Sequence, residues 1–259
     1  MFTTGQEVRK ACRDGQWAGQ TSGLAYGFVQ ANLVILPQDW AWDFLVFAQR
    51  NPKPCPVLEV GERGGYTTRF LADGADIRSD LPLYRVYEQG VMKQEIPDIS
   101  HLWRDDFVFF LIGCSYSFEQ ALLEAEVEVR HISENKNVPM YATNISCAGA
   151  GRFPDVPMVV SMRPLTPGAA MKAVTITREF PSVHGAPVHM GNPGAIGIKD
   201  INAPDWGDRV TIREGEIPVF WACGVTPQMA AAVAKPPLMI THVPGHMFVG
   251  DRKNFQYRI

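Results

Sequence analysis

Apolar residues recur every three or four positions in several segments of the chain, which is the spacing of one face of an α-helix. Residues 5–19 show this pattern, with Val8, Ala11 and Cys12 on one face and charged residues between them. We therefore predict an amphipathic helix there. The same spacing predicts further helices at residues 38–50, 98–103, 118–126, 168–179 and 227–234.

Strands are predicted where short apolar runs or alternating positions lie between turn-forming residues. Residues 83–87 and 91–95 flank a short polar segment that ends in Gly90, the pattern of a β-hairpin. The long apolar run at 24–36 is interrupted by Gln30 and Asn32. Further strands are expected at residues 57–60, 127–132, 138–144, 195–198, 210–213, 217–221 and 238–241, the last being the final core strand.

One strand points to the fold class. Residues 156–162 are almost purely apolar, which predicts a strand buried on both faces. Such a strand favours a layered α/β fold over a sheet with one face in water. The 259 residues suffice for one large domain or two modest ones, and no repeat divides the chain.

Composition and charge exclude several classes of protein. The chain is 46% hydrophobic and 20% charged, with a formal net charge of −3 and no long basic run, which argues against nucleic-acid binding. No apolar stretch approaches the length of a membrane span, and the first thirteen residues lack the apolar core of a signal peptide. Five cysteines without paired spacing favour a reducing compartment, so we expect a cytoplasmic protein.

Two histidines lie in the segment richest in turn-forming residues, 181–191. Pro187 separates His184 from His189, so the two cannot share a regular helix, but a kinked loop can turn both rings toward one pocket. An imidazole titrates near neutral pH, which makes both candidates for general acid–base catalysis. The alternative for each is a hydrogen-bonded structural role.

A second pair, His242 and His246, resembles a metal-binding pair only in its spacing. Pro244 and Gly245 forbid the helix that would bring the two rings together, and no nearby acid completes a ligand set. The sequence therefore predicts no metal site. His246 remains a candidate for substrate binding.

The turn after residue 112 carries two polar candidates. Its pattern, GCSYS at 113–117, resembles a nucleophile elbow, but Ser117 replaces the last glycine, which weakens a nucleophilic role. Ser115 could bind substrate at the start of the following helix, or it could simply cap that helix. Glu119 lies in the first turn, where it either favours the helix dipole or acts as a general acid or base.

The segment 221–228 repeats this order of strand, turn and helix start. Cys223 is a candidate thiolate nucleophile at a helix N-terminus, or else a small buried residue. Thr226 opens the helix and could bind substrate, as could Asn32. Arg163 ends the strand at 156–162 and could clamp a substrate carboxylate, or pair with Asp205 or Asp208.

Eight segments together resemble the D-glutamate cyclase family and span residues 20–251. They are GLAYGFVQANL (23–33), NPKPCP (51–56), IGCS (112–115), NVPMY (137–141), VSMRP (160–164), HGAPVH (184–189), PVFWACGVTPQ (218–228) and PGHM (244–247). The resemblance implies a cytosolic bacterial protein with a three-layer αβα lobe and a smaller two-layer α+β lobe. We place the lobes at 1–145 plus 215–259 and at 146–214, within one unit of 259 residues.

The resemblance also implies lyase chemistry with loss or addition of water. Animal relatives interconvert D-glutamate and 5-oxo-D-proline, but the family offers no agreed catalytic residues to carry over. Cyclising glutamate needs a base for the amine, an acid for the departing hydroxide, and stabilisation of an oxyanion. His184 or His189 would be the base, Glu119 or the other histidine the acid, and Arg163 the carboxylate clamp.

The leading hypothesis is thus a cofactor-independent hydro-lyase that acts on a small carboxylate or amino acid. Two alternatives stay open: an acyl-transfer or amide-hydrolysing enzyme that uses Cys114 or Cys223, and a non-catalytic binder of small carboxylates. Neither a nucleic acid nor a membrane is expected as a partner. Several tryptophans would allow a homodimer without requiring one: Trp40, Trp42 and Trp103.

Overall fold

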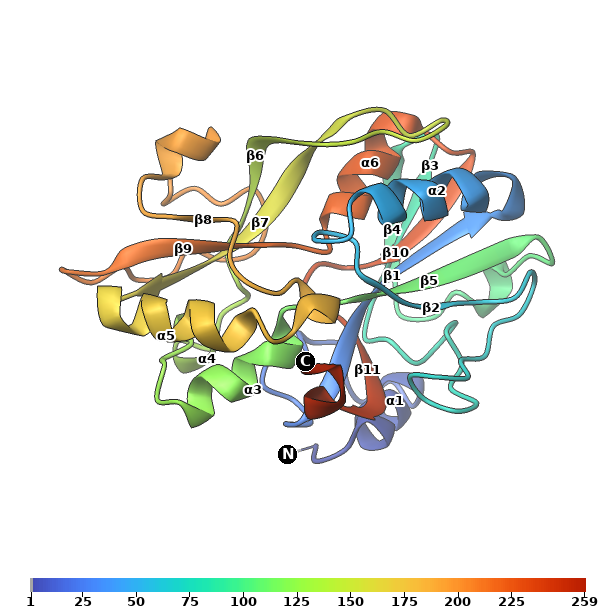
Figure 1. The fold of residues 1–259 in the computed structure, drawn as a ribbon. Helices are drawn as coiled ribbons and strands as arrows, with labels where there is room; N and C mark the ends of the chain where they lie inside the picture. Colours follow the sequence, from blue (N-terminus) through green and yellow to red (C-terminus); the bar gives the residue numbers. More distant parts are fainter. Residues whose placement is uncertain (1) are drawn as a thin grey trace.

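Two β-sheets form the centre of the structure, a computed structural model that describes residues 2–259 (Figure 1). The larger sheet has the strand order β2-β5-β1-β10-β3-β4, with β11 also paired to β1, and the smaller has the order β6-β7-β9-β8. Neighbouring strands run antiparallel in both sheets. The strands of the larger sheet are β1 (Phe28–Pro37), β2 (Val57–Val60), β3 (Tyr84–Glu88), β4 (Val91–Ile96), β5 (Phe107–Gly113), β10 (Leu238–His242) and β11 (Phe248–Lys253). Those of the smaller sheet are β6 (Met140–Cys147), β7 (Val156–Leu165), β8 (His189–Met190) and β9 (Ile217–Ala222).

Helices cover both sides of these sheets. The α-helices are α1 (Gly5–Arg13), α2 (Gln38–Arg50), α3 (Tyr116–Glu124), α4 (Arg130–Ser133), α5 (Pro167–Thr177) and α6 (Thr226–Ala234). Short 3-10 turns are η1 (Ser100–Leu102), η2 (Pro181–Val183), η3 (Pro193–Ile196) and η4 (Asn254–Tyr257). In the view of Figure 1, α2 and α6 lie above the sheets and α3 and α5 below them. The α/β fold with two sheets that the sequence predicts is confirmed.

No helix within residues 2–259 is both long enough and apolar enough to cross a membrane.

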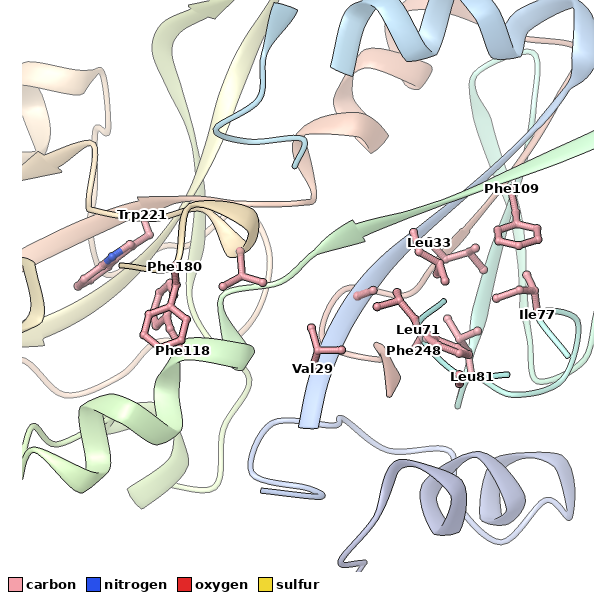
Figure 2. Packing of buried hydrophobic residues seen from close by; sticks show 14 of the residues in the cluster. Val29, Leu33, Leu71, Ile77, Leu81, Phe109, Phe118, Phe180, Trp221 and Phe248 are labelled. Atoms are coloured by element: carbon pink, nitrogen blue, oxygen red, sulfur yellow. The ribbon is translucent and has the colours of Figure 1, made fainter. Parts of the chain in front are cut away.

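Strand β1 shows how the sequence builds the layers. Its side chains alternate, so that Leu33 packs into the core shared with α3 and α5, whereas Val34 packs into the core shared with α2 and α6. Figure 2 shows the first of these cores, with Leu33 toward one end and Trp221 and Phe118 toward the other. Because alternation has a period of two, Gln30 and Asn32 share the face of Val34. The polar end of β1 therefore lies on that face.

Several predicted elements are confirmed with shifted ends. The hairpin is β3 and β4, and its two turn residues, Gln89 and Gly90, have positive φ angles of 50° and 78°. The N-terminal helix stops at Arg13 rather than at residue 19, because Gly15 takes a left-handed φ of 69°. The helix expected at 98–103 is only the 3-10 turn η1. The lobe boundary at residues 146–214 stays a prediction.

The predicted strand at 127–132 is wrong. Val127 and Val129 are buried as the alternation requires, but they pack without a partner strand, and the chain turns into α4. Arg130 fixes this turn, because its guanidinium pairs with Glu128 and with Glu216 at 2.6 Å. Alternation reports which residues are buried, whereas a strand also needs a neighbour to pair with.

The predicted strands at 195–198 and 210–213 are also wrong. Residues 193–196 form η3, which Gly197 ends with a φ of 81°, and residues 210–213 take no regular structure. The strand at 238–241 is not the last in the core, because β11 follows it with Phe248 and Val249 fully buried.

The hairpin turn provides a test of how tightly β3 and β4 pack on α6. A Cβ atom on Gly90 would lie 2.6 Å from the carbonyl oxygen of Ala232, whereas one on Gly74, at a similar φ of 71°, would meet nothing within 4 Å. We expect Gly74→Ala to lower the free energy of unfolding by about 1 kcal/mol through backbone strain alone. Gly90→Ala should lose about 1–3 kcal/mol more through overpacking. Urea unfolding curves measure both, and equal losses would contradict the close packing on α6.

Candidate functional site

A buried ion pair joins the smaller sheet to helix α3. Arg163 on β7 is 1% exposed and Glu119 on α3 is 2% exposed. The Nε atom of Arg163 donates to Glu119 Oε1 at 3.2 Å, and its Nη2 atom donates to the same oxygen. The alternative partners expected from the sequence are not used, because Asp205 and Asp208 each accept a backbone amide hydrogen bond instead. The cation proposed as a substrate clamp thus holds a carboxylate of the protein itself.

The remaining contacts of Arg163 fix its guanidinium in place. Nη1 donates to Ser161 Oγ at 3.1 Å and Nη2 to Ser115 Oγ at 3.0 Å. The rings of Phe118 and Trp221 both lie 5.3 Å from the guanidinium carbon, which adds cation–π attraction. These contacts offset part of the large cost of burying a charge.

Ser115 before α3 and Ser117 in its first turn both serve tertiary contacts. Ser115 makes no side-chain capping bond and accepts from Arg163 instead. The hydroxyl of Ser117 accepts from the backbone amide of Gln30 at 2.9 Å on β1. The capping alternative given for Ser115 is therefore wrong.

His131 completes this cluster, although it was not among the candidates predicted from the sequence. Its Nε2 atom lies 3.0 Å from Glu119 Oε1, and its ring stacks on Tyr116 at a centroid distance of 5.9 Å. The ring is buried on α4, within the segment that alternation wrongly predicted as a strand. We name Glu119, Arg163, His131 and Ser115 the acid–base cluster.

The carboxylate of Glu119 stays ionised although it is buried. Burial acts to raise its pKa, but the nearby imidazole of His131 and the guanidinium of Arg163 together hold that pKa below its usual range. Oε1 receives the contacts of Arg163 and His131, whereas Oε2 has one long contact, 3.4 Å from Ser22 Oγ. Oε2 is therefore the oxygen that can exchange a proton with a ligand.

Two adjoining cavities lie beside α3, and the smaller one is lined by Glu119. The inner hollow has a volume of about 10 Å³ and is lined by Gln30, Tyr116, Glu119, Ile132 and Asn254, with residues 23–28 and Gln120. The outer pocket has a volume of about 360 Å³, large enough for a small molecule, and two cations line it, Lys253 and Arg258. The two cavities share four residues: Tyr26, Gly27, Gln120 and Asn254.

The two turns that follow β5 and β9 meet between the sheets. Asn32 lies between them, since its Nδ2 atom donates to the carbonyl oxygen of Gly113 at 2.8 Å while a Cβ on Gly224 would lie 2.0 Å from the same nitrogen. Asn32 thus acts as a spacer between the turns. Cys114 and Cys223 share one buried apolar cluster there.

Burial makes both cysteines poor nucleophiles. It raises the pKa of Cys223 to about 11 and that of Cys114 further still, although the backbone amide two residues ahead of each sulfur acts in the opposite direction. Both are thiols at neutral pH, so the geometry does not favour a thiolate nucleophile.

Thr226 and His246 have partners within the protein. The hydroxyl of Thr226 donates to the carbonyl oxygen of Cys223 at 2.8 Å and accepts from the amide of Val159 at 3.0 Å, which ties α6 to β7. The Nδ1 atom of His246 lies 3.2 Å from the carbonyl oxygen of Pro244, and burial lowers its pKa.

His184 and His189 have different surroundings. His184 is buried with a left-handed φ of 83°, and its Nδ1 atom bonds to the carbonyl oxygen of Lys53 at 2.8 Å. His189 lies on β8, partly exposed, with its Nε2 atom 2.8 Å from the carbonyl oxygen of Asn192 and its ring against Phe220. His184 lines a pocket of about 360 Å³ in which His189 takes no part.

Within residues 2–259, no three side chains of His, Cys, Asp or Glu gather closely enough to hold a metal ion.

Removing Glu119 tests the buried ion pair. We expect Glu119→Leu to lower the free energy of unfolding by roughly 3–5 kcal/mol, because Arg163 is left buried without a counter-charge. Glu124→Leu, an exposed position on the same helix, is the control and should change it little. The double variant Glu119→Leu with Arg163→Met should recover part of the loss. Urea unfolding measures all three, and an unchanged midpoint for Glu119→Leu would contradict a stabilising pair.

The buried His184 should make stability depend on pH. Burial lowers its pKa from 6.5 to about 4, against the opposing effect of the Lys53 carbonyl. Between pH 4 and pH 6.5 the unfolded chain binds the proton more readily than the folded protein does. The stabilisation that comes from neutral His184 is therefore complete above pH 6.5 and is lost as the pH falls toward 4. It amounts to roughly 3 kcal/mol. His184→Asn keeps a donor and tolerates the left-handed φ, so its unfolding free energy should fall less steeply from pH 6.5 to 4. An unchanged slope would refute the assignment to His184.

The chain is similar to known proteins over most of its length. Residues 108–251 match the D-glutamate cyclase family. A relative from Clostridium beijerinckii named "Putative hydro-lyase" is 56% identical over 252 residues, 97% of this chain and 96% of its own. "Putative hydro-lyase GK2103" from Geobacillus kaustophilus is 57% identical over 97% of this chain and 95% of its own, and "Putative hydro-lyase YcsI" from Bacillus subtilis is 55% identical over 95% of each.

One solved structure also aligns, a nitrogen repressor-like protein MJ0159 from Methanococcus jannaschii. It covers 98% of this chain and 100% of its own at 7% identity, but its TM-score of 0.37 is too low to support an argument. The family match and the similarity over nearly the full length both identify a lyase. The chain belongs to the D-glutamate cyclase family.

Proposed function

We propose that the protein adds water to, or removes it from, a small amino acid or carboxylate, with the interconversion of D-glutamate and 5-oxo-D-proline as the specific reaction. The family and the names of the relatives support the class of reaction. The observation that carries the proposal is the acid–base cluster, where a fully buried carboxylate contacts an imidazole at 3.0 Å. Perturbed, buried ionisable groups of this kind are typical of active sites.

In this proposal Glu119 transfers the protons. Its Oε2 atom takes a proton from the attacking amine and gives it to the departing hydroxide, which leaves as water, while the imidazole of His131 beside Oε1 stabilises the charge changes on the carboxylate. Arg163 acts as a positioning residue, because its guanidinium keeps Glu119 ionised and oriented. The substrate carboxylate would face Lys253 and Arg258 in the outer pocket.

His184 and His189, which were predicted from the sequence, are competing candidates for the general acid or base. His184 lies behind the turn at Gly113 and lines a pocket of its own with Lys53 and Arg178, so it could serve a ligand bound there. His189 sits at the edge of the smaller sheet. A role for Cys223 as nucleophile would require its raised pKa to fall on substrate binding.

Proton NMR of the purified protein with D-glutamate, L-glutamate and 5-oxo-D-proline in separate samples tests the proposal. We expect D-glutamate and 5-oxo-D-proline to interconvert. Glu119→Gln and His131→Gln should each slow the reaction by roughly a hundredfold or more, the usual effect of losing a general acid or base. Glu214→Gln, at an exposed position that lines neither cavity, should keep the wild-type rate.

The same assay separates the candidates. Full activity in His131→Gln together with a large loss in His184→Asn or His189→Ala would move the reaction to the loop at 181–191. A loss in Cys223→Ser alone would revive the thiol mechanism. If no variant and no wild-type sample turns over any of the three compounds, the specific reaction is wrong.

A further inference from the structure

Two residues that line the inner hollow each carry a buried side-chain oxygen with no hydrogen-bond partner within residues 2–259: Gln30 Oε1 and Asn254 Oδ1. Gln30 is 3% exposed and Asn254 is 8% exposed, so bulk water does not supply the missing hydrogen bonds to these two oxygens. A buried polar group that stays unsatisfied destabilises the fold, because no hydrogen bond replaces those it loses to water. Buried polar groups in folded proteins nearly always have a partner, either protein or ordered water.

The orientation of the Gln30 amide is determined by its own contacts. Its Nε2 atom donates to the carbonyl oxygens of Thr21 at 2.9 Å and of Leu24 at 3.4 Å. A flipped amide would place an oxygen against those carbonyl oxygens, so Oε1 must point away from both. The unsatisfied atom is therefore an acceptor, and it calls for a ligand that donates.

The size of the hollow narrows the choice of ligand. Its volume of about 10 Å³ is close to the space that one water molecule needs. The oxygens of Gln30, Asn254 and Glu119 around it are all acceptors at neutral pH, which excludes an anion. The four residues shared with the outer pocket give the ligand a route to the substrate.

We propose that a single water molecule binds in the inner hollow, donates hydrogen bonds to Gln30 Oε1 and Asn254 Oδ1 beside Glu119, and is the water that the reaction exchanges. The site itself follows from the two buried acceptors, whereas its part in the reaction rests on the proposed function. Gln30 and Asn254 are then positioning residues for the reacting water.

The step balances without a further reactant. In the hydrating direction the water oxygen forms a bond to the lactam carbonyl carbon and the carbon–nitrogen bond breaks. One water proton passes to Glu119 Oε2 and on to the departing nitrogen, and the other leaves the new carboxyl group for the same amine. The water oxygen stays in the side-chain carboxylate. Dehydration is the reverse.

A high-resolution crystal structure tests the site independently of activity. Electron density for one water within hydrogen-bond distance of both oxygens is the expected result. Asn254→Leu removes one acceptor while keeping the branched shape and the number of side-chain heavy atoms, and should lose this water, while Asn254→Asp keeps an acceptor and should retain it. An empty hollow in the wild type would overturn the proposal.

Oxygen-18 labelling tests the role of the water. With 5-oxo-D-proline in H₂¹⁸O, mass spectrometry of the glutamate formed gives the rate of incorporation. Asn254→Leu and Gln30→Met should lower kcat roughly tenfold with little change in KM, as expected for losing about one hydrogen bond to the reacting water. Asn254→Asp should restore much of the rate.

Gln94→Leu is the control, because Gln94 is exposed on β4 and lines neither cavity. It should keep both the water and the rate. Wild-type incorporation in Asn254→Leu and Gln30→Met, with the ordered water lost, would overturn the catalytic role. If the wild type turns over no substrate, the proposed function fails, and the crystal structures still decide whether the water site exists.

Discussion

The structure depends on one buried ion pair, that of Arg163 with Glu119. The pair joins strand β7 of the smaller sheet to helix α3, which follows strand β5 of the larger sheet. Two charges removed from water are tolerated only when hydrogen bonds and nearby groups compensate them. Here Ser115 and Ser161 accept hydrogen bonds from Arg163, and the imidazole of His131 lies 3.0 Å from Glu119 Oε1. Each of these partners comes from a different element. The pair therefore requires the two sheets to meet in one arrangement, and the polar cluster is assembled only when they do.

The junction of the sheets explains why chemistry is concentrated there. A strand ends and a helix begins at two places, after β5 and after β9, and both turns approach the amide of Asn32. Close approach of this kind needs a residue without a side chain, which is why Gly224 lies against that amide. The polar residues Gln30 and Asn32 stand on one face of β1, so a single strand supplies both the spacer between the turns and an acceptor in the inner hollow.

Burial sets the chemical character of the groups at this junction. It keeps Cys114 and Cys223 protonated by raising their pKa values, and it would neutralise Glu119 as well, were the carboxylate not flanked by Arg163 and His131. The result is a buried, ionised carboxylate that lines the hollow, with Oε1 contacted by Arg163 and His131 and Oε2 left with one long contact to Ser22. A buried, ionised carboxylate of this kind suits proton transfer to a small ligand. The two protonated cysteines, by contrast, are poorly suited to nucleophilic attack.

Periodicity in the sequence was enough to predict α1, α2, the hairpin of β3 and β4, and the buried strand β7, because each depends on local spacing of apolar residues. Position at the ends of elements was enough to single out Ser115, Glu119 and Arg163 one at a time. Their assembly could not be predicted, since Arg163 and Glu119 are 44 positions apart and no local rule pairs a strand end with a helix start. His131 was hidden for the same reason: the segment 127–132 alternates like a strand, and only the long-range pairing of Arg130 with Glu216 turns it into a helix that brings the imidazole to Glu119. Local patterns fix which residues are buried, whereas the contacts between distant segments decide which buried polar groups meet.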